Sequence, residues 1–105
     1  MNTNIGNQSL SLGNVYATSN IASINDHQFI DFVNASIIRH KNIDFGDLEE
    51  EDVESNLYAL QTQGRILSSY NLPNHLKGLH TLNDKIWIIT EWDRSITTVL
   101  FPSEY

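Results

Sequence analysis

The chain has no cysteine, and its 105 residues include only six lysines and arginines and two prolines. Without cysteine it can form no disulfide, thiolate metal site or cysteine nucleophile, which fits a reducing compartment. The first twenty residues carry no Lys or Arg, unlike a secretory signal, and no apolar run approaches the roughly 20 residues of a membrane span. We therefore expect a single cytoplasmic domain that is neither exported nor embedded in a membrane.

Acidic residues outnumber basic ones by thirteen to six, and the net charge is −7. This balance opposes direct binding of nucleic acid, because affinity for phosphate backbones comes from cationic side chains. It leaves two readings open, a surface that only keeps the protein in solution and a surface that binds a basic protein. The four histidines lack metal-ligand spacing, and there is no glycine-rich phosphate loop or G-x-S-x-G elbow. No metal and no cofactor are expected.

The residue patterns predict one α+β domain over residues 12–105, preceded by a flexible N-terminus over residues 1–11 that is rich in Asn and Ser. The predicted helices and strands cover, in order, residues 27–40, 49–63, 65–72, 85–91 and 96–101. The three strands form an antiparallel meander with both helices on one face, and residues 12–17 are a candidate additional strand. A short helical turn is expected just after that segment.

The second helix has several local signals. Asp47 is placed to be its N-cap, and Gly64 to be the glycine that follows its C-terminus. Val53, Leu57 and Leu60 have the spacing of an inner apolar stripe, with Asn56 on the same side. These residues predict which face of the helix meets the sheet.

The stretch from Asp44 to Glu54 contains seven carboxylates and no base. Carboxylates in the first turn of a helix are stabilised by the positive end of its dipole, so the charge run can be purely structural. The stretch lacks the alternating ligands and central glycine of a calcium-binding EF-hand loop. A further reading is that the adjacent carboxylates imitate phosphates and occupy a nucleic-acid-binding groove on another protein.

A second polar cluster lies at the turn between the last two strands. Glu91 and Arg94, together with His40 at the end of the first helix, could act as base and phosphate clamp of a small ribonuclease. In the alternative reading, Asp93 caps the turn, Arg94 pairs with a carboxylate, and His40 is a helix-end or surface histidine. Trp92 is a candidate apolar anchor for a protein partner.

The strand over residues 85–91 has apolar residues on both faces, with Trp87 and Ile89 on one and Ile86 and Ile88 on the other. Such a strand is expected at the centre of a sheet. Its second face would meet the N-terminal segment or a partner, which could be a second copy of the chain.

Three blocks carry a resemblance: FVNASIIRH, DFGDLEEEDVESNLYALQTQGRILSSYNL and KIWIITEWDRSITTVLFPSEY. They resemble a family of small proteins encoded on bacterial plasmids and integrated elements, often described as plasmid-related. The matching residues are Arg39, His40, Asp44, Gly46, Asp47, Asn56, Gly64, Arg65, Trp87, Thr90, Glu91, Asp93, Arg94 and Ser95. The chain departs from the pattern at Ile43, where glycine is usual, at Phe45, where tryptophan is usual, and at Trp92, where a small residue is usual.

The resemblance implies no enzymatic activity. Small acidic proteins of mobile elements often inhibit host defence, so the implied partner is a host nuclease or CRISPR effector, bound through an imitation of nucleic acid. The binding residues expected on this hypothesis are Asp44, Asp47, Glu50, Glu51, Glu54, Trp92, Asp93 and Arg94. Two alternatives stay open, the ribonuclease-like toxin and a homodimeric structural or regulatory protein.

Overall fold

A computed structural model describes residues 9–78 and 83–105 of the chain. Its elements are β1 (Asn14–Ala17), α1 (Ser19–Ala22), α2 (His27–Lys41), α3 (Glu50–Thr62), β2 (Ile66–Asn71), η2 (Asn74–Leu76), β3 (Lys85–Thr90), β4 (Ile96–Leu100) and η3 (Pro102–Glu104). The strands form one sheet in the order β1-β4-β3-β2, in which β1 runs parallel to β4 and the other pairs are antiparallel. The predicted α+β class is confirmed, and the N-terminal strand makes the sheet mixed.

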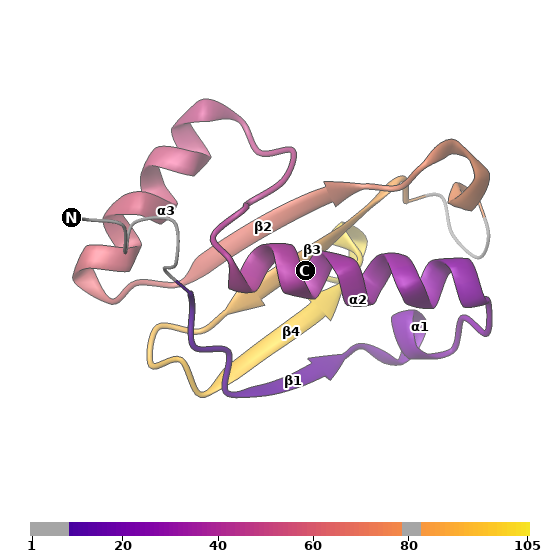
Figure 1. Cartoon of the computed structure of the whole chain (residues 1–105), viewed down its shortest axis with the longest axis horizontal. Coiled ribbons are helices and arrows are strands. Elements are labelled where there is room, and N and C mark those ends of the chain that lie inside the picture. The colour runs from indigo at the N-terminus through magenta and orange to yellow at the C-terminus, as the bar shows by residue number, and fades with distance from the viewer. Residues whose placement is uncertain (1–8, 79–82) are drawn as a thin grey trace.

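The first core cluster lies between α2 and the sheet. The Asp26 side chain caps α2 by accepting a hydrogen bond from the Phe29 amide at 2.9 Å. Phe29 then packs with Tyr70 of β2, Ile88 of β3 and other buried apolar residues. Figure 1 shows α2 lying along the sheet, with α3 beside it near β2.

The second core cluster lies under α3. Ala59 of the helix packs with Ile66, and Ile66 lies on the same face of β2 as Ser68 and Tyr70. Both helices therefore cover the same face of the sheet, as the sequence predicts. Leu10 joins this cluster at 4% exposure, and its amide donates to the Lys41 carbonyl at 2.7 Å. Of the N-terminus predicted to be flexible, residues 1–8 lie outside the described part of the chain.

Three local predictions for α3 are wrong. Its N-cap is Glu49, and Asp47 instead accepts a hydrogen bond from the Asn71 amide at 2.9 Å. The helix ends one residue earlier than expected, so the left-handed residue after it is Gln63, with φ 61°, and not Gly64. Leu57 is 48% exposed, because the inner face of the helix is centred on Asn56.

The face of the sheet away from the helices is covered in part by the C-terminus. The rings of Trp87 and Tyr105 meet edge to face with centroids 5.8 Å apart, and the Arg65 guanidinium lies 5.1 Å from the Tyr105 centroid. The predicted alternation of Trp87 with its strand neighbours is confirmed by the register of β3. Within the described residues, the aromatic ring that meets Trp87 is that of Tyr105.

Candidate protein-binding surface

His40 lies inside the domain and not at a helix-end surface as expected. It has no solvent exposure, and burial lowers the pKa of its imidazole to about 4. Its Nδ1 is 2.6 Å from the Ser68 hydroxyl oxygen, and its Nε2 is 2.8 Å from that of Thr90. The Thr90 hydroxyl lies 2.7 Å from that of Thr97. The ring is thus neutral near pH 7 and enclosed by strand hydroxyls.

The end of this hydrogen-bond chain defines the protonated nitrogen of His40. The Thr97 hydroxyl donates to the Leu12 carbonyl at 2.7 Å, and a carbonyl can only accept. Thr97 must therefore accept from Thr90, and Thr90 from the His40 Nε2–H. That leaves Nδ1 as the acceptor for Ser68. With both ring nitrogens engaged away from solvent, His40 cannot serve as a base for an external substrate.

Arg39 and Asp44 form an ion pair at the end of α2. The Arg39 Nε lies 2.7 Å from Asp44 Oδ2, and both side chains are about half exposed, at 46% and 50%. The hydrogen bond from Arg39 holds the pKa of Asp44 below its usual value. The Asp44 carbonyl also accepts from the Tyr70 hydroxyl at 2.6 Å, and burial raises the pKa of Tyr70 to about 12. Asp44 therefore stabilises the fold, since it links the end of α2 to Tyr70 of β2.

Gly46 follows this ion pair and lets the loop run close alongside the edge of β2, where it forms a parallel bridge with Ser69. Its φ is 73°, and a Cβ there would collide with the Ser69 carbonyl oxygen. Only glycine combines that conformation with such a close approach. This course brings Asp47 to the end of β2, where its carboxylate accepts a hydrogen bond from the Asn71 amide.

Arg94 connects the β3–β4 turn to the C-terminus of α3. Its guanidinium donates to the Gly64 carbonyl at 2.6 Å, to the Glu91 carbonyl at 3.1 Å and to the Ala59 carbonyl at 3.3 Å. A cation that binds the last carbonyls of a helix stabilises the negative end of its dipole. The partners of Arg94 are thus backbone carbonyls, and not the carboxylate that the sequence predicted.

Elsewhere in this turn, Asp93 is hydrogen-bonded to Ser95, whereas Trp92 is exposed. Asp93 Oδ1 accepts from the Ser95 amide at 3.1 Å and from the Ser95 hydroxyl at 2.7 Å, as expected of a turn-capping aspartate. Trp92 makes no such internal contact among the described residues and is 62% exposed. Trp92 is therefore the exposed apolar side chain of this turn.

The first two turns of α3 present an acidic surface to solvent. Glu49, Glu50, Glu51 and Glu54 line a shallow hollow of about 330 Å³. In the described part of the chain, the Arg39–Asp44 pair is the one ion pair found, so these carboxylates have no basic partner there. Their charge is directed outward.

Two exposed apolar residues continue the acidic surface along α3. Leu57 is 48% exposed and Tyr58 is 69% exposed. They follow Glu50 and Glu54 at helical spacing and so lie on the same side of the helix. We call Glu50, Glu51, Glu54, Leu57 and Tyr58 the α3 surface. The apolar half of this surface was not predicted from the sequence, and the signal that could have revealed it is an apolar pair outside the stripe of Val53 and Asn56.

The predicted binding residues divide into separate groups. Asp44 and Asp47 are used by the fold, and Asp93 and Arg94 hold the turn. Glu50 and Glu54 lie at the start of α3, whereas Arg94 and its neighbour Trp92 lie at the end. A helix of 13 residues is about 20 Å long, so the acidic residues and Trp92 do not form one compact site.

Within residues 9–78 and 83–105, no three His, Asp or Glu side chains are placed to hold a metal ion together. No helix of that part is long and apolar enough to cross a membrane. Comparisons with protein-family models, curated proteins and solved structures find no match. The class of the protein therefore comes from its own fold, which is an α+β domain with a four-stranded mixed sheet and two main helices on one face.

Proposed function

We propose that the protein is a non-enzymatic binding protein that docks its α3 surface onto a positively charged groove of another protein. The observation that supports this is the exposed carboxylates of Glu50, Glu51 and Glu54, which have no internal basic partner and border exposed Leu57 and Tyr58. Unpaired charges favour encounter with a surface of opposite sign. A neighbouring aromatic residue offers the kind of anchor that dominates binding energy at interfaces.

The proposed partner is a host nuclease or CRISPR effector in the cytoplasm. The plasmid-related resemblance suggests such a setting, and the grooves of these proteins are built to hold phosphates. Carboxylates along one side of a helix would compete with the nucleic acid for the same basic residues. The protein would then inhibit by occupying the groove and would itself need no catalytic residue.

The ribonuclease-like alternative depended on Glu91, Arg94 and His40. His40 is enclosed by hydroxyl groups, and the Arg94 guanidinium is engaged with three carbonyls. Neither group is free to meet a phosphate. The geometry therefore favours a binding role over this chemistry.

Affinity capture from host lysate with two matched variants tests the proposal. Glu50→Lys/Glu54→Lys reverses two charges of the α3 surface, and Asp31→Lys/Asp84→Lys makes the same change in net charge elsewhere. We expect a nucleic-acid-binding protein to be recovered by the wild type and by the second variant but not by the first. Equal recovery by both variants would contradict a role for the α3 surface.

A further inference from the structure

The two edges of the sheet differ in a way that bears on self-association. On the β2 edge, backbone groups of Leu67, Ser69 and Asn71 that point outward are hydrogen-bonded by the preceding loop and helix. The covering groups are the Asn56 side-chain amide, the backbone of Phe45 and Asp47, and the Asp47 carboxylate. This edge is closed to another strand.

The opposite edge, formed by β1, is open. The amides of Asn14 and Thr18 donate to the carbonyls of Ser95 and Val99, so these residues direct their backbone toward β4. Because backbone direction alternates along a strand, Val15 and Ala17 direct their N–H and C=O groups outward. Within the described residues no hydrogen bond reaches those groups, and all four residues of β1 are exposed. Unpaired edge strands readily pair with another chain.

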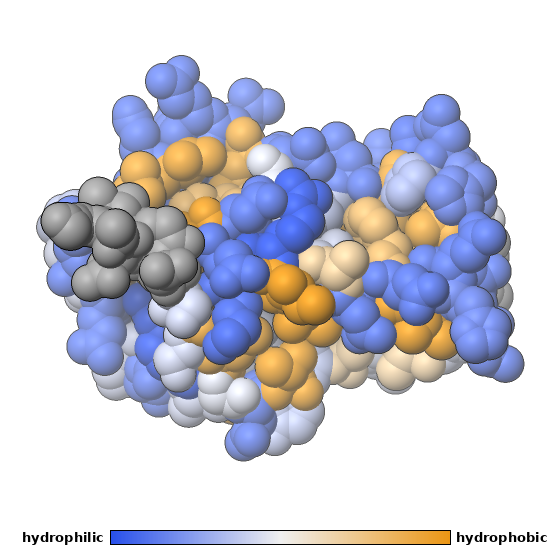
Figure 2. All heavy atoms as spheres, in the orientation of Figure 1, coloured by the Kyte–Doolittle hydropathy of each residue, from blue (hydrophilic) through white to orange (hydrophobic). Residues whose placement is uncertain are grey.

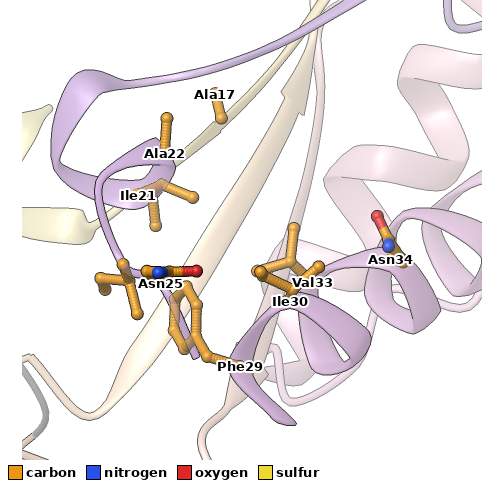
Figure 3. A pocket seen from close by; sticks show the side chains of 9 residues that line it. Ala17, Ile21, Ala22, Asn25, Phe29, Ile30, Val33 and Asn34 are labelled. Atoms are coloured by element: carbon orange, nitrogen blue, oxygen red, sulfur yellow. The ribbon is translucent and has the colours of Figure 1, made fainter. Parts of the chain in front are cut away.

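The strand itself (Asn14–Ala17) and the pocket beside it are uncharged, and among the described residues the one carboxylate bound near its end is Glu104, which accepts hydrogen bonds from the side chains of Thr18 and Asn20. A pocket of about 330 Å³ opens between β1, α1 and α2, and all nine of its lining residues are uncharged. Figure 3 shows Ala17, Ile21 and Ile30 around it. Figure 2 shows hydrophobic residues gathered over the region between α2 and β1. The side chains of Val15 and Tyr16 are 43% and 54% exposed.

We propose that β1 pairs antiparallel with β1 of a second copy of this chain and joins the two sheets into one of eight strands. A two-fold contact places the same patch against itself, and the four residues of β1 that would meet their copies carry no charge to repel them. The acidic α3 surface lies by the closed β2 edge, at the far side of the sheet. In the dimer the two acidic surfaces would be at opposite ends, where their repulsion is screened by salt.

The hydrogen-bonding pattern selects one register. Pairing Val15 with Ala17 of the second copy, and Ala17 with its Val15, satisfies all four outward-directed residues of the two strands. Tyr16 then lies opposite Tyr16 of the second copy at the two-fold axis, in a non-hydrogen-bonded pair with Cα atoms about 4.5 Å apart. The Val15 side chain of one copy would lie beside the small Ala17 of the other, at the mouth of the pocket.

Because the chain has no cysteine, a single introduced thiol tests this register. The full-length Tyr16→Cys variant should form an intermolecular disulfide, since its Cα separation lies in the range that a disulfide needs. Val15→Cys is the matched control. In the proposed register it lies opposite Ala17, and its separation from its own copy exceeds the roughly 7 Å that a disulfide can bridge. Tyr58→Cys on α3 controls for random collision.

We expect Tyr16→Cys to run as a covalent dimer in mild oxidant, at least tenfold more abundant than for either control. Sedimentation should give twice the chain mass of 12.0 kDa for the wild type and the single mass for Val15→Lys with an unchanged circular dichroism spectrum. A wild type that stays monomeric at millimolar concentration would overturn the proposal. Equal cross-linking of Tyr16→Cys and Tyr58→Cys would do so as well. The outcome is independent of the α3 partner.

Discussion

His40 Nε2 lies 2.8 Å from the Thr90 hydroxyl oxygen and joins the last turn of α2 to the central strand β3. The two residues are 50 positions apart in the sequence. Because the imidazole donates from Nε2 and accepts at Nδ1, the contact requires the neutral ring. Protonation would turn Nδ1 into a second donor facing Ser68 in a buried site.

The neutral state of His40 predicts a loss of stability in acid. Its pKa falls from 6.5 to about 4 on folding. Above pH 6.5 neither state is protonated, so His40 adds no pH dependence there. Between pH 6.5 and 4 the unfolded chain binds a proton that the folded protein does not, and the free energy of unfolding should fall by about 1.4 kcal/mol per pH unit. The total contribution is about 3 kcal/mol.

Urea unfolding at pH 7, 6, 5 and 4.5 measures this slope. The His40→Gln variant is the control, since it removes the titrating group and should flatten the curve over this range while lowering stability at neutral pH. Identical slopes for wild type and His40→Gln would show that His40 is not the source.

Replacing Gln63 with glycine should stabilise the folded protein. It is exposed and has φ 61°, a conformation that costs a non-glycine residue roughly 1 kcal/mol. Gln63→Gly is expected to raise the free energy of unfolding by about 0.5–1 kcal/mol. Gln61→Gly, two residues earlier and inside α3, should lower it by about 1 kcal/mol because glycine is a poor helix former. Thermal unfolding of both variants checks the sign, and a loss in Gln63→Gly would contradict the assigned role.

Arg94→Ala should destabilise the domain by about 1.5–3 kcal/mol, since charged donors to three carbonyls are lost at the end of α3. Arg65→Ala removes only an exposed cation–aromatic contact and should cost less than about 1 kcal/mol. Chemical unfolding gives both values. If Arg94→Ala kept full stability yet lost binding, Arg94 would belong to the binding surface and not to the fold.

Much of the fold was predictable, because α2 has a clear helical apolar periodicity and the last two strands are runs of β-branched and aromatic residues separated by a short turn. The parallel pairing of β1 with β4 was not, since a four-residue strand exposed throughout has no alternation to reveal its partner. The burial of His40 was equally hidden, because Ser68 and Thr90 come from strands 28 and 50 positions further on.

The site was harder to predict than the fold. The charges of Glu50, Glu51 and Glu54 were plain in the sequence, but the exposure of Leu57 was not. The side-chain amide of Asn56 forms hydrogen bonds with both the N–H and the C=O of Leu67 and so fixes which side of α3 faces β2. Ile43 has φ 64°, a conformation that side chains rarely adopt, and nothing in the apolar pattern of the sequence indicates it.

The most direct test of the account is competition between this protein and nucleic acid for the captured partner. With the partner purified, fluorescent duplex DNA or guide RNA is bound to it and the protein is titrated in at two salt concentrations. We predict full displacement by the wild type, a binding constant weakened at least tenfold in Glu50→Lys/Glu54→Lys, and weaker competition at high salt. A stable ternary complex with the nucleic acid still bound would contradict the claim that the α3 surface occupies its groove.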